Sequence, residues 1–183
     1  TGLVGCLDID DYLSDTIKKH ELTREDKERD RMRHLDNLSA QTGLVFTFYR
    51  EDGSGRQLFA RALQAAPEVD FTAEDGVRHV LRRVRDGVLI DAFKKLLDPL
   101  PVYIADGHHR AASAVKVGLE RRKANPEHTG EEEYNRFLAV VFPHDQLKIL
   151  PYNRVVRDLN GMSAAGFLKE LGRSFEIGEA GSG

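Results

Sequence analysis

The sequence has a single cysteine among its 183 residues, which excludes an internal disulfide framework and fits a reducing cytoplasm. Cys6 lies in an apolar run, so we expect it to be a buried, structural thiol. The sequence also lacks an apolar run of about 18 residues, the length that a membrane-spanning helix needs, and it shows no secretory signal at its start. We therefore expect a cytoplasmic protein without a membrane partner.

An excess of positive charge is missing as well. The chain has 27 Lys and Arg against 30 Asp and Glu, a net charge of −3, and no recognisable helix-turn-helix. This balance argues against nucleic acid as a partner, because nucleic-acid-binding domains favour a basic patch. Charged residues make up 31% and hydrophobic residues 40% of the chain, proportions typical of a globular rather than a disordered protein.

The two ends of the sequence indicate part of a longer protein. The chain opens without Met on residues 1–7, which are typical of an internal strand. It ends on the Gly-rich residues 179–183, which we expect to form a disordered tail or linker. The length fits one domain of ordinary size. We therefore expect residues 1–178 to form a single α+β domain.

The apolar pattern predicts strands and helices without a regular strand–helix–strand repeat. Strands are predicted over residues 1–7, 44–49, 69–72, 77–84, 102–105, 137–142, 148–156 and 175–177. Helices are predicted over residues 12–18, 23–38, 58–63, 88–97, 108–120 and 163–171. Asp75 and Gly76 predict a hairpin turn, and Asp8, Thr23 and Ser163 are placed to cap helices. The mixture predicts the α+β class, with an irregular mixed sheet and flanking helices.

One strand-to-helix junction carries side chains suited to binding an anion. The predicted strand 102–105 leads into the segment Asp106–Arg110, which opens a helix. Asp106 is suited to cap that helix, and Gly107 permits a tight turn and the close approach of a ligand. Unpaired N–H groups at the helix start favour an anion, and the planar guanidinium of Arg110 suits a phosphate. The junction therefore predicts a phosphate-binding site.

Three interpretations of His108 and His109 are open. They can donate hydrogen bonds or carry protons beside a bound phosphate. The simpler alternative is a capped helix with two surface histidines and a solvated Arg110. We favour the first, because imidazole and guanidinium groups beside the positive end of a helix dipole are unfavourable unless an anion compensates them. The third interpretation is a zinc site, although adjacent histidines on a helix point in different directions and the common spacing is i, i+4.

The segment Glu21–Arg33 is dense in charges of both signs. Like charges repeat at i, i+4, as in Asp26 with Asp30 and Lys27 with Arg31, which disfavours a helix optimised for ion pairs. An acidic stripe beside a basic stripe is suited to bind a nucleotide with Mg2+. The alternative is that the segment forms a helix face that contacts only solvent. The candidate site residues here are Glu21, Arg24, Lys27, Asp30 and Arg31.

Three segments resemble the motifs of one protein family. Residues 104–110 and the Ala-rich helix after them resemble the signature of domain-of-unknown-function family 1015. Residues 17–31 resemble its polar motif H-E-x-T-x-x-D-K-E-x-D-R, and residues 147–156 resemble its third motif. The three occur in the expected order over nearly the whole chain. Arg154, in the third motif, is either a further phosphate contact or an ordinary surface charge.

The Asp-Gly-His-His-Arg element of this family is similar to the phosphate-binding box of the ParB/sulfiredoxin superfamily. That group includes nucleotide hydrolases of chromosome segregation, sulfinic-acid reductases that use ATP, and free-serine kinases. The resemblance implies that a nucleotide phosphate contacts Gly107, His108, His109 and Arg110. It makes Asp106 a candidate to bind magnesium or to activate a substrate hydroxyl. Sulfiredoxins carry Cys in this box where the present chain has His108, which disfavours a thiol-based reductase.

These observations lead to three hypotheses about function. The first is a phosphotransferase that uses ATP or ADP with Mg2+ on a small hydroxyl-bearing metabolite such as free serine. In it, the catalytic residues are Asp106, His108 and Glu21, the metal ligands are Asp106 and Asp30, and the nucleotide ligands are Gly107, His108, His109, Arg110, Arg24, Lys27, Arg31 and Arg154. The second is a ParB-like regulatory module that binds a nucleotide without small-molecule chemistry. The third is a metal-dependent hydrolase that uses His108 and His109. A homodimer is compatible with each.

Overall fold

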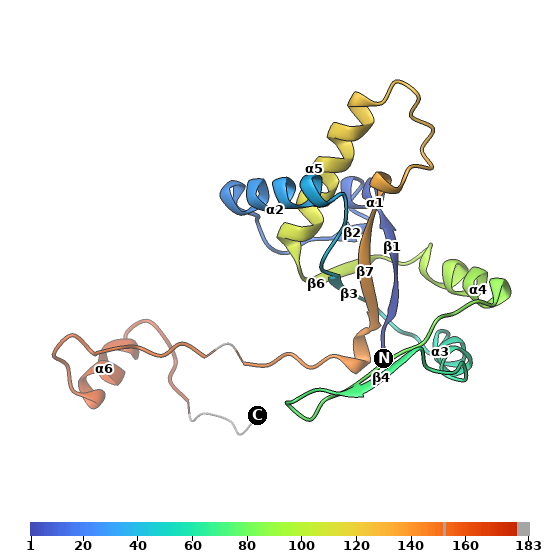
Figure 1. The fold of residues 1–183 in the computed structure, drawn as a ribbon. Coiled ribbons are helices and arrows are strands. Elements are labelled where there is room, and N and C mark those ends of the chain that lie inside the picture. Colours follow the sequence, from blue (N-terminus) through green and yellow to red (C-terminus); the bar gives the residue numbers. More distant parts are fainter. Residues whose placement is uncertain (152, 179–183) are drawn as a thin grey trace. The chain divides into compact units, whose positions relative to one another are not determined.

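The computed structural model describes residues 1–151 and 153–178 (Figure 1). The chain forms two compact units, Thr1–Lys148 and Ile149–Gly183. The sequence led us to expect one domain over residues 1–178. The tail expected at residues 179–183 lies outside the described residues. The first unit is built on a mixed sheet flanked by helices, which confirms the predicted α+β class.

The main sheet of the first unit has five strands in the order β1-β7-β3-β6-β2. Its central strand β3 runs parallel to β7 and antiparallel to β6, while the outer pairs are β1 antiparallel to β7 and β2 parallel to β6. The strands are β1 (Leu3–Asp8), β2 (Ile17–Lys18), β3 (Val45–Tyr49), β6 (Val102–Asp106) and β7 (Arg136–Pro143). The order and direction of these strands depend on pairings between residues far apart in the sequence, which is why only a coarse fold class could be predicted.

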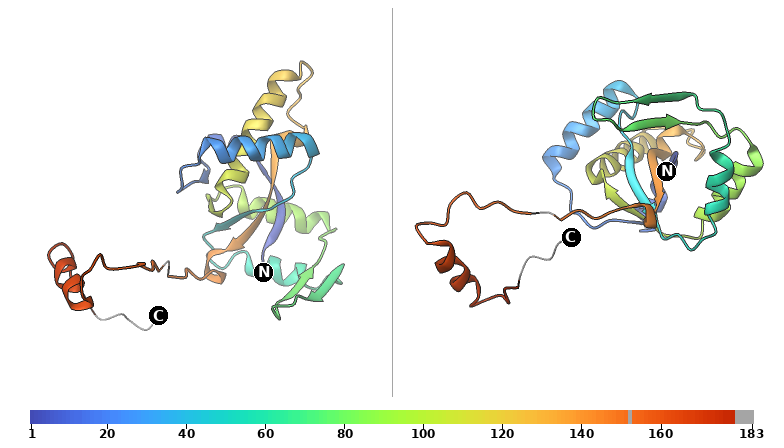
Figure 2. Two further views of the ribbon diagram at one scale, coloured as in Figure 1. Left: turned by 60° about the vertical axis from the view of Figure 1, so that its left-hand side comes forward. Right: turned by 90° about the horizontal axis from the view of Figure 1, so that it is seen from below.

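One face of this sheet carries the core. Along β3 and β7 every second residue is buried, the pattern of strands covered on one face. One cluster packs the sheet against α1 (Ile9–Leu13) and α5 (His108–Ala124), and a second packs it against α3 (Arg56–Ala62) and α4 (Gly87–Leu97). Helix α2 (Glu25–Leu38) lies against α5 (Figure 2). The first cluster therefore fixes α5, and with it the start of the helix that carries the predicted site.

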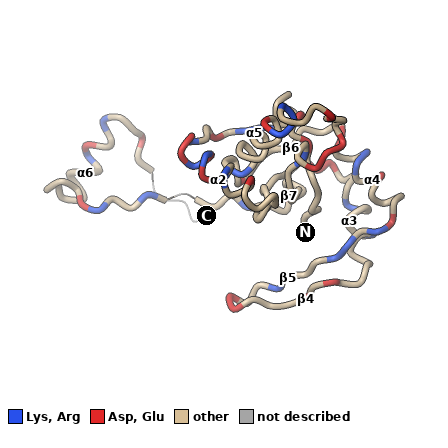
Figure 3. Tube along the Cα trace, turned by 45° about the horizontal axis from the view of Figure 1, so that its top comes forward, with Lys and Arg blue, Asp and Glu red and all other residues tan. Residues whose placement is uncertain are grey.

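A separate two-stranded sheet is formed by β4 (Val69–Thr72) and β5 (Arg78–Leu81). The turn between them includes Asp75, whose carboxylate accepts a hydrogen bond from the Val77 N–H at 2.9 Å, and Gly76 at φ +82°. The predicted Asp-Gly hairpin is thus confirmed. Acidic residues lie on β4 and at the turn, and basic residues lie on β5 and just after it (Figure 3).

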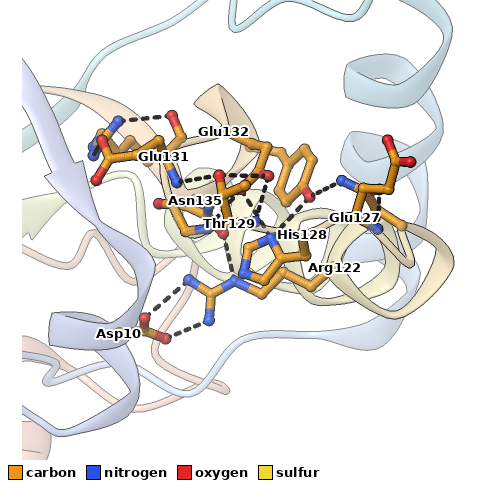
Figure 4. Close-up of polar contacts among 12 residues, drawn as sticks. Asp10, Arg122, Glu127, His128, Thr129, Glu131, Glu132 and Asn135 are labelled. Carbon is orange, nitrogen blue, oxygen red and sulfur yellow. Dashed lines mark hydrogen bonds and ion pairs between the residues drawn. The ribbon is translucent and has the colours of Figure 1, made fainter.

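A network of charges fixes the far end of α5 (Figure 4). The Arg122 guanidinium binds both carboxylate oxygens of Asp10, at 2.6 and 2.9 Å, and this pairing lowers the pKa of Asp10. Burial alone would raise the pKa of Glu132, but N–H donors of Thr129 and Gly130 hold it at about 2. Helix α5 runs to Ala124, beyond the end predicted at residue 120. Two short 3₁₀ turns, Glu133–Asn135 and His144–Gln146, flank β7.

Two predictions about the N-terminal segment are wrong. Residues 17 and 18 were predicted to continue the first helix, but that helix ends at Leu13, and Ile17–Lys18 form β2. Asp15 adopts φ +61°, which turns the chain, and Ile17 gains burial against β6.

The prediction that Cys6 is a buried thiol is also wrong. Cys6 is exposed, because it lies with Val4 on the outward face of the edge strand β1.

The second unit contains one helix among its described residues, α6 (Ala164–Leu171). Ser163 Oγ accepts a hydrogen bond from the Gly166 N–H at 3.1 Å, which confirms the predicted cap. The strands predicted over 148–156 and 175–177 are not formed by the described residues there. Ile149 and Val155 are almost fully exposed, because apolar residues alone form no strand without a partner strand. None of the described helices is long and apolar enough to cross a membrane.

Candidate phosphate-binding site

The predicted junction forms as a strand, a glycine turn and a helix. Strand β6 ends at Asp106, Gly107 adopts φ +96°, and α5 begins at His108. The expected cap by Asp106 is wrong: Gly107 occupies the cap position, and no described side chain accepts from the first N–H groups of α5. Asp106 instead accepts a hydrogen bond from Arg110 Nη2 at 3.0 Å. The helix start therefore keeps uncapped backbone donors facing outward from its positive end.

Arg110 lies between two glycines. A Cβ on Gly107 would come within 2.9 Å of Arg110 Nε, and a Cβ on Gly43 would come within 3.3 Å of Nη1. A side chain on Gly107 would therefore shift the guanidinium, and the positive φ of Gly107 disfavours other residues as well. Arg110 Nε is buried and has no hydrogen-bond partner among the described residues. The chain thus folds Arg110 back over the start of its own helix.

A pocket of about 450 Å³ opens in front of this helix start. It is bounded by α2, by the loop that leads from α2 to β3, and by the first turns of α5. It brings together most of the predicted site residues, namely Glu21, Lys27, Arg31, Asp106, Gly107, His108, His109 and Arg110. Lys27 and Arg31 face it from α2, so the basic stripe predicted from sequence does line a cavity.

Several lining residues were not predicted. His34 follows Lys27 and Arg31 at i, i+4, i+7 on α2, a spacing that places all three on one helix face and could have identified it. Thr42 and Gln41 come from the loop, for which the sequence carries no such signal. Gln41 donates from Nε2 to the carbonyl of Arg136 at 3.0 Å and accepts at Oε1 from the N–H of residue 138 at 2.6 Å. The loop is therefore tied to the sheet and forms a fixed wall.

His108 is the most buried of the lining residues with ionisable side chains, at 3% exposure. Its Nδ1 lies 3.3 Å from Glu21 Oε2, and its Nε2 accepts the backbone N–H of His20 at 3.5 Å. Burial, and then the nearby His20, lower the pKa of His108, so the ring is neutral at pH 7 with its proton on Nδ1. Both nitrogens are therefore engaged, Nδ1 with the Glu21 carboxylate and Nε2 with the backbone of His20.

The lowered pKa of His108 predicts a loss of stability in mild acid. The unfolded imidazole takes up a proton near pH 6.5, before the folded one does, so its contribution is complete above pH 6.5 and is lost as the pH falls below that value. We expect the free energy of unfolding, measured by urea titration between pH 7 and pH 5, to decrease less in His108→Asn than in the natural chain. His79→Asn, at an exposed histidine of β5, should keep the natural slope. An equal dependence of the free energy of unfolding on pH in all three proteins would contradict the lowered pKa of His108.

A buried ion pair fixes α2 against α5. The Glu28 carboxylate accepts hydrogen bonds from Lys116 Nζ and Thr23 Oγ1, which lower the pKa of Glu28. Ser113 Oγ donates to the Glu28 carbonyl at 3.2 Å. The expected cap of α2 by Thr23 is therefore wrong, because its hydroxyl is used by the Glu28 side chain and no side chain caps α2 at Arg24. The pair sets the position of Lys27 and Arg31 relative to the start of α5.

Two predicted site residues of the first unit do not line the pocket. Arg24 pairs with Asp26 at 2.9 Å, and Asp30 pairs with Arg33 at 3.3 Å, in both cases on the exposed surface of α2. Arg154 belongs to the second unit, which is described by itself. Within residues 1–151 and 153–178, no three His, Cys, Asp or Glu side chains gather where they could hold a metal ion.

The pocket fits a phosphate group. His109 Nδ1 and Arg110 Nε are buried and have no hydrogen-bond partner in the described part of the chain, so a ligand could satisfy both. Lys27, Arg31 and Arg110 supply three cations, and the first N–H groups of α5 supply backbone donors. A magnesium ion fits less directly, because the carboxylate of Asp106 is already paired with Arg110.

A family model with the description "Protein of unknown function (DUF1015)" matches residues 1–182. No curated protein and no solved structure matches the chain. The match covers all three motif segments and both compact units.

Proposed function

The chain belongs to the DUF1015 family, and we propose that it is a nucleotide-dependent phosphotransferase acting on a small hydroxyl-bearing metabolite, with free serine as the single best candidate. One observation carries the proposal. The cations Lys27, Arg31 and Arg110 and an uncapped helix start line the same pocket as the carboxylate of Glu21. The likeness of the Asp106–Arg110 segment to the ParB/sulfiredoxin box supports a nucleotide as the phosphate donor.

The cationic side of the pocket would bind and orient the phosphates. Arg110 and the N–H groups of α5 would hold the phosphoryl group to be transferred, and Lys27 and Arg31 would bind the remaining phosphates from α2. Asp106, which lines the pocket, would hold magnesium beside the phosphates, and the ion would supply positive charge there. In phosphoryl transfer most of the catalysis comes from such positioning and charge neutralisation.

Glu21 is the residue that we assign as general base. Its carboxylate lines the pocket and is positioned by His108 Nδ1 at 3.3 Å, whereas the Asp106 carboxylate is held by Arg110. Glu21 would accept the proton of the substrate hydroxyl as its oxygen attacks the terminal phosphorus of the nucleotide. The bond from that phosphorus to the bridging oxygen breaks, and the nucleotide leaves with one phosphate fewer. His108 would keep Glu21 in place without exchanging a proton itself.

A nucleotide panel followed by a transfer assay tests the proposal. ATP, ADP, CTP and GTP with Mg2+ are each added at about 100 times their Kd, where binding stabilises the folded chain by about 2.7 kcal/mol and raises the Tm measurably. The nucleotide that binds is then incubated with serine and with a pool of other hydroxyl-bearing metabolites. A phosphorylated product supports the phosphotransferase. Binding without any transfer would favour the regulatory module, and bound zinc in the purified protein would favour the hydrolase.

Replacing Glu21 separates chemistry from binding. We expect Glu21→Gln to lower kcat for phosphate transfer by about 100-fold, since general bases contribute about 10²–10⁴-fold, while the Kd of the nucleotide changes little. Glu25→Gln, an exposed glutamate at the start of α2, is the matched control and should retain the natural rate. An unchanged kcat in Glu21→Gln would remove Glu21 from the mechanism.

A further inference from the structure

The main sheet is apolar on both of its faces. The buried residues of β3 and β7 face the helices and include members of both core clusters, so the residues between them point to the opposite, outward face. The apolar residues on this outward face are Val4, Cys6, Phe46, Phe48, Tyr103, Ala105, Leu138, Val140 and Phe142. None of them belongs to either core cluster, and each keeps part of its surface exposed. A sheet that meets water on one side alternates apolar with polar residues, whereas strands buried on both sides are apolar throughout. These strands are therefore typical of a sheet whose outward face is covered.

Aromatic rings make the outward face continuous. Phe46 and Phe142 pack edge to face, with ring centroids 4.9 Å apart. Phe48 stacks on Tyr103, with ring centroids 5.2 Å apart. The ring of Phe142 also lies across Gly2, where a Cβ would come within 2.8 Å of it. The rings come from the adjacent strands β7, β3 and β6, so they form one patch at the middle of the sheet. Aromatic residues are enriched in this way at the centres of protein interfaces.

Opposite charges lie at the two ends of the outward face. Arg50 takes the next outward position after Phe48, is exposed, and forms no ion pair with another described residue. Asp8 takes the last outward position of β1, opposite Arg136, which is already paired with Glu131 at 3.3 Å. Since β3 runs parallel to β7 and β7 antiparallel to β1, Arg50 and Asp8 lie at opposite ends of the strands. A two-fold axis that crosses the strands would set the Arg50 end of each copy against the Asp8 end of the other, so the face is complementary to itself.

We propose that the outward face is the interface of a homodimer, in which a second copy of the chain packs its own outward face against it around a two-fold axis. This inference does not depend on the phosphate site. With strands about 4.8 Å apart and about 3.3 Å per residue, the apolar patch measures about 15–20 Å in each direction. A patch of this extent marks an interaction site. Two sheets pack face to face about 10 Å apart through interdigitated side chains, which suits such a surface on both copies. Homodimer interfaces are more apolar than those of transient complexes, and the uncharged centre of this face therefore favours a second copy.

Sedimentation velocity over a range of protein concentrations tests the inference. We expect the natural chain to form a dimer with a Kd of about 1 µM or tighter. Phe48→Asp and Val4→Asp should each raise this Kd at least about 100-fold, because the dimer would bury an unpaired carboxylate from both copies. Val4 is already 46% exposed, so its variant folds even if Phe48→Asp does not, and circular dichroism checks both. Phe71→Asp, at a phenylalanine of β4 that is 53% exposed, is the matched control and should keep the natural Kd.

The thiol of Cys6 provides a second measurement, because it is exposed on the outward face. We expect its reaction with an aromatic disulfide reagent to slow as the protein concentration rises through the Kd, and to stay fast at every concentration in Val4→Asp. A natural chain that remains monomeric, or a dimer that persists in the folded Val4→Asp and Phe48→Asp proteins, would overturn the inference. A dimer that Phe71→Asp dissociates would move the interface to β4 and β5 and overturn it as well. Protection of Cys6 that does not change with concentration would show that the cover is not a second copy.

Discussion

Replacing Arg110 with alanine is expected to lower the rate of phosphate transfer by about 1,000-fold or more, because an arginine that stabilises the transferred phosphoryl group contributes about 10³–10⁵-fold. Arg110 is the cation that meets the uncapped start of α5, and its buried Nε lacks a partner in the described chain. Among the described residues, Arg110 alone lies against both Gly43 and Gly107, so no other lysine or arginine can take its place there. Steady-state assays with the nucleotide found in the panel measure the effect.

Two further variants make this result specific. Arg110→Lys keeps the charge but not the planar fork, and we expect it to recover only a small part of the rate. Arg33→Ala removes an exposed arginine of α2 outside the pocket, and it should leave both rate and affinity unchanged. Circular dichroism and urea titration confirm that each variant is folded. Substantial activity in a folded Arg110→Ala protein would reject the placement of the phosphate at this helix.

The sequence predicted those parts of the fold that depend on local chemistry. The Asp-Gly turn between β4 and β5 and the Ser163 cap of α6 each involve residues within three positions of one another. The strand, glycine and helix of residues 102–110 could be located for the same reason. By contrast, β2 is two residues long and exists because Ile17 is buried beside β6, about 85 positions later. No local sequence pattern predicts a partner strand that lies so far along the chain.

Competition between side chains explains the two helix caps that were wrongly predicted. Asp106 and Thr23 are both good capping residues at suitable positions. In the structure the Asp106 carboxylate binds Arg110, one helical turn later, and the Thr23 hydroxyl binds Glu28. A charged partner outweighs a backbone N–H group as a hydrogen-bond partner. Capping rules that consider a single residue miss this, and the misses fall at the pocket, where ionisable residues are concentrated.

The pocket itself could be predicted only in part. Residues 106–110 and the charged stripe of α2 were identified separately, and the like charges of Lys27 and Arg31 indicated a shared role. The sequence did not show that Gln41 would fasten a loop to β7, almost 100 residues away, and so complete the wall of the pocket. It also did not show that His108 would be buried with both ring nitrogens engaged. Motif chemistry alone therefore does not show whether a side chain binds the ligand or positions a neighbouring side chain. The fold is needed to separate these two roles.

The contact between α2 and α5 is expected to be the most sensitive point for stability. Glu28 is 5% exposed at its side chain, and Lys116 is the only cation paired with it among the described residues. Lys116→Ala would leave this carboxylate buried with the Thr23 hydroxyl as its remaining side-chain donor. Breaking a buried ion pair costs about 3–5 kcal/mol, and because Lys116 itself is half-exposed we expect about 3 kcal/mol. Urea titration measures the loss.

A double-mutant cycle shows whether the loss comes from the stranded charge. In a Glu28→Gln background the buried group is neutral, so the further change Lys116→Ala should lower the free energy of unfolding by less than about 1 kcal/mol. Lys123→Ala, at an exposed lysine in the last turn of α5, should change it by no more than about 0.5 kcal/mol. An equal loss for Lys116→Ala in both backgrounds would contradict the ion pair. Because Lys27 and Arg31 lie on the helix that this pair holds, Lys116→Ala should also weaken binding of the nucleotide found in the panel, although Lys116 does not line the pocket.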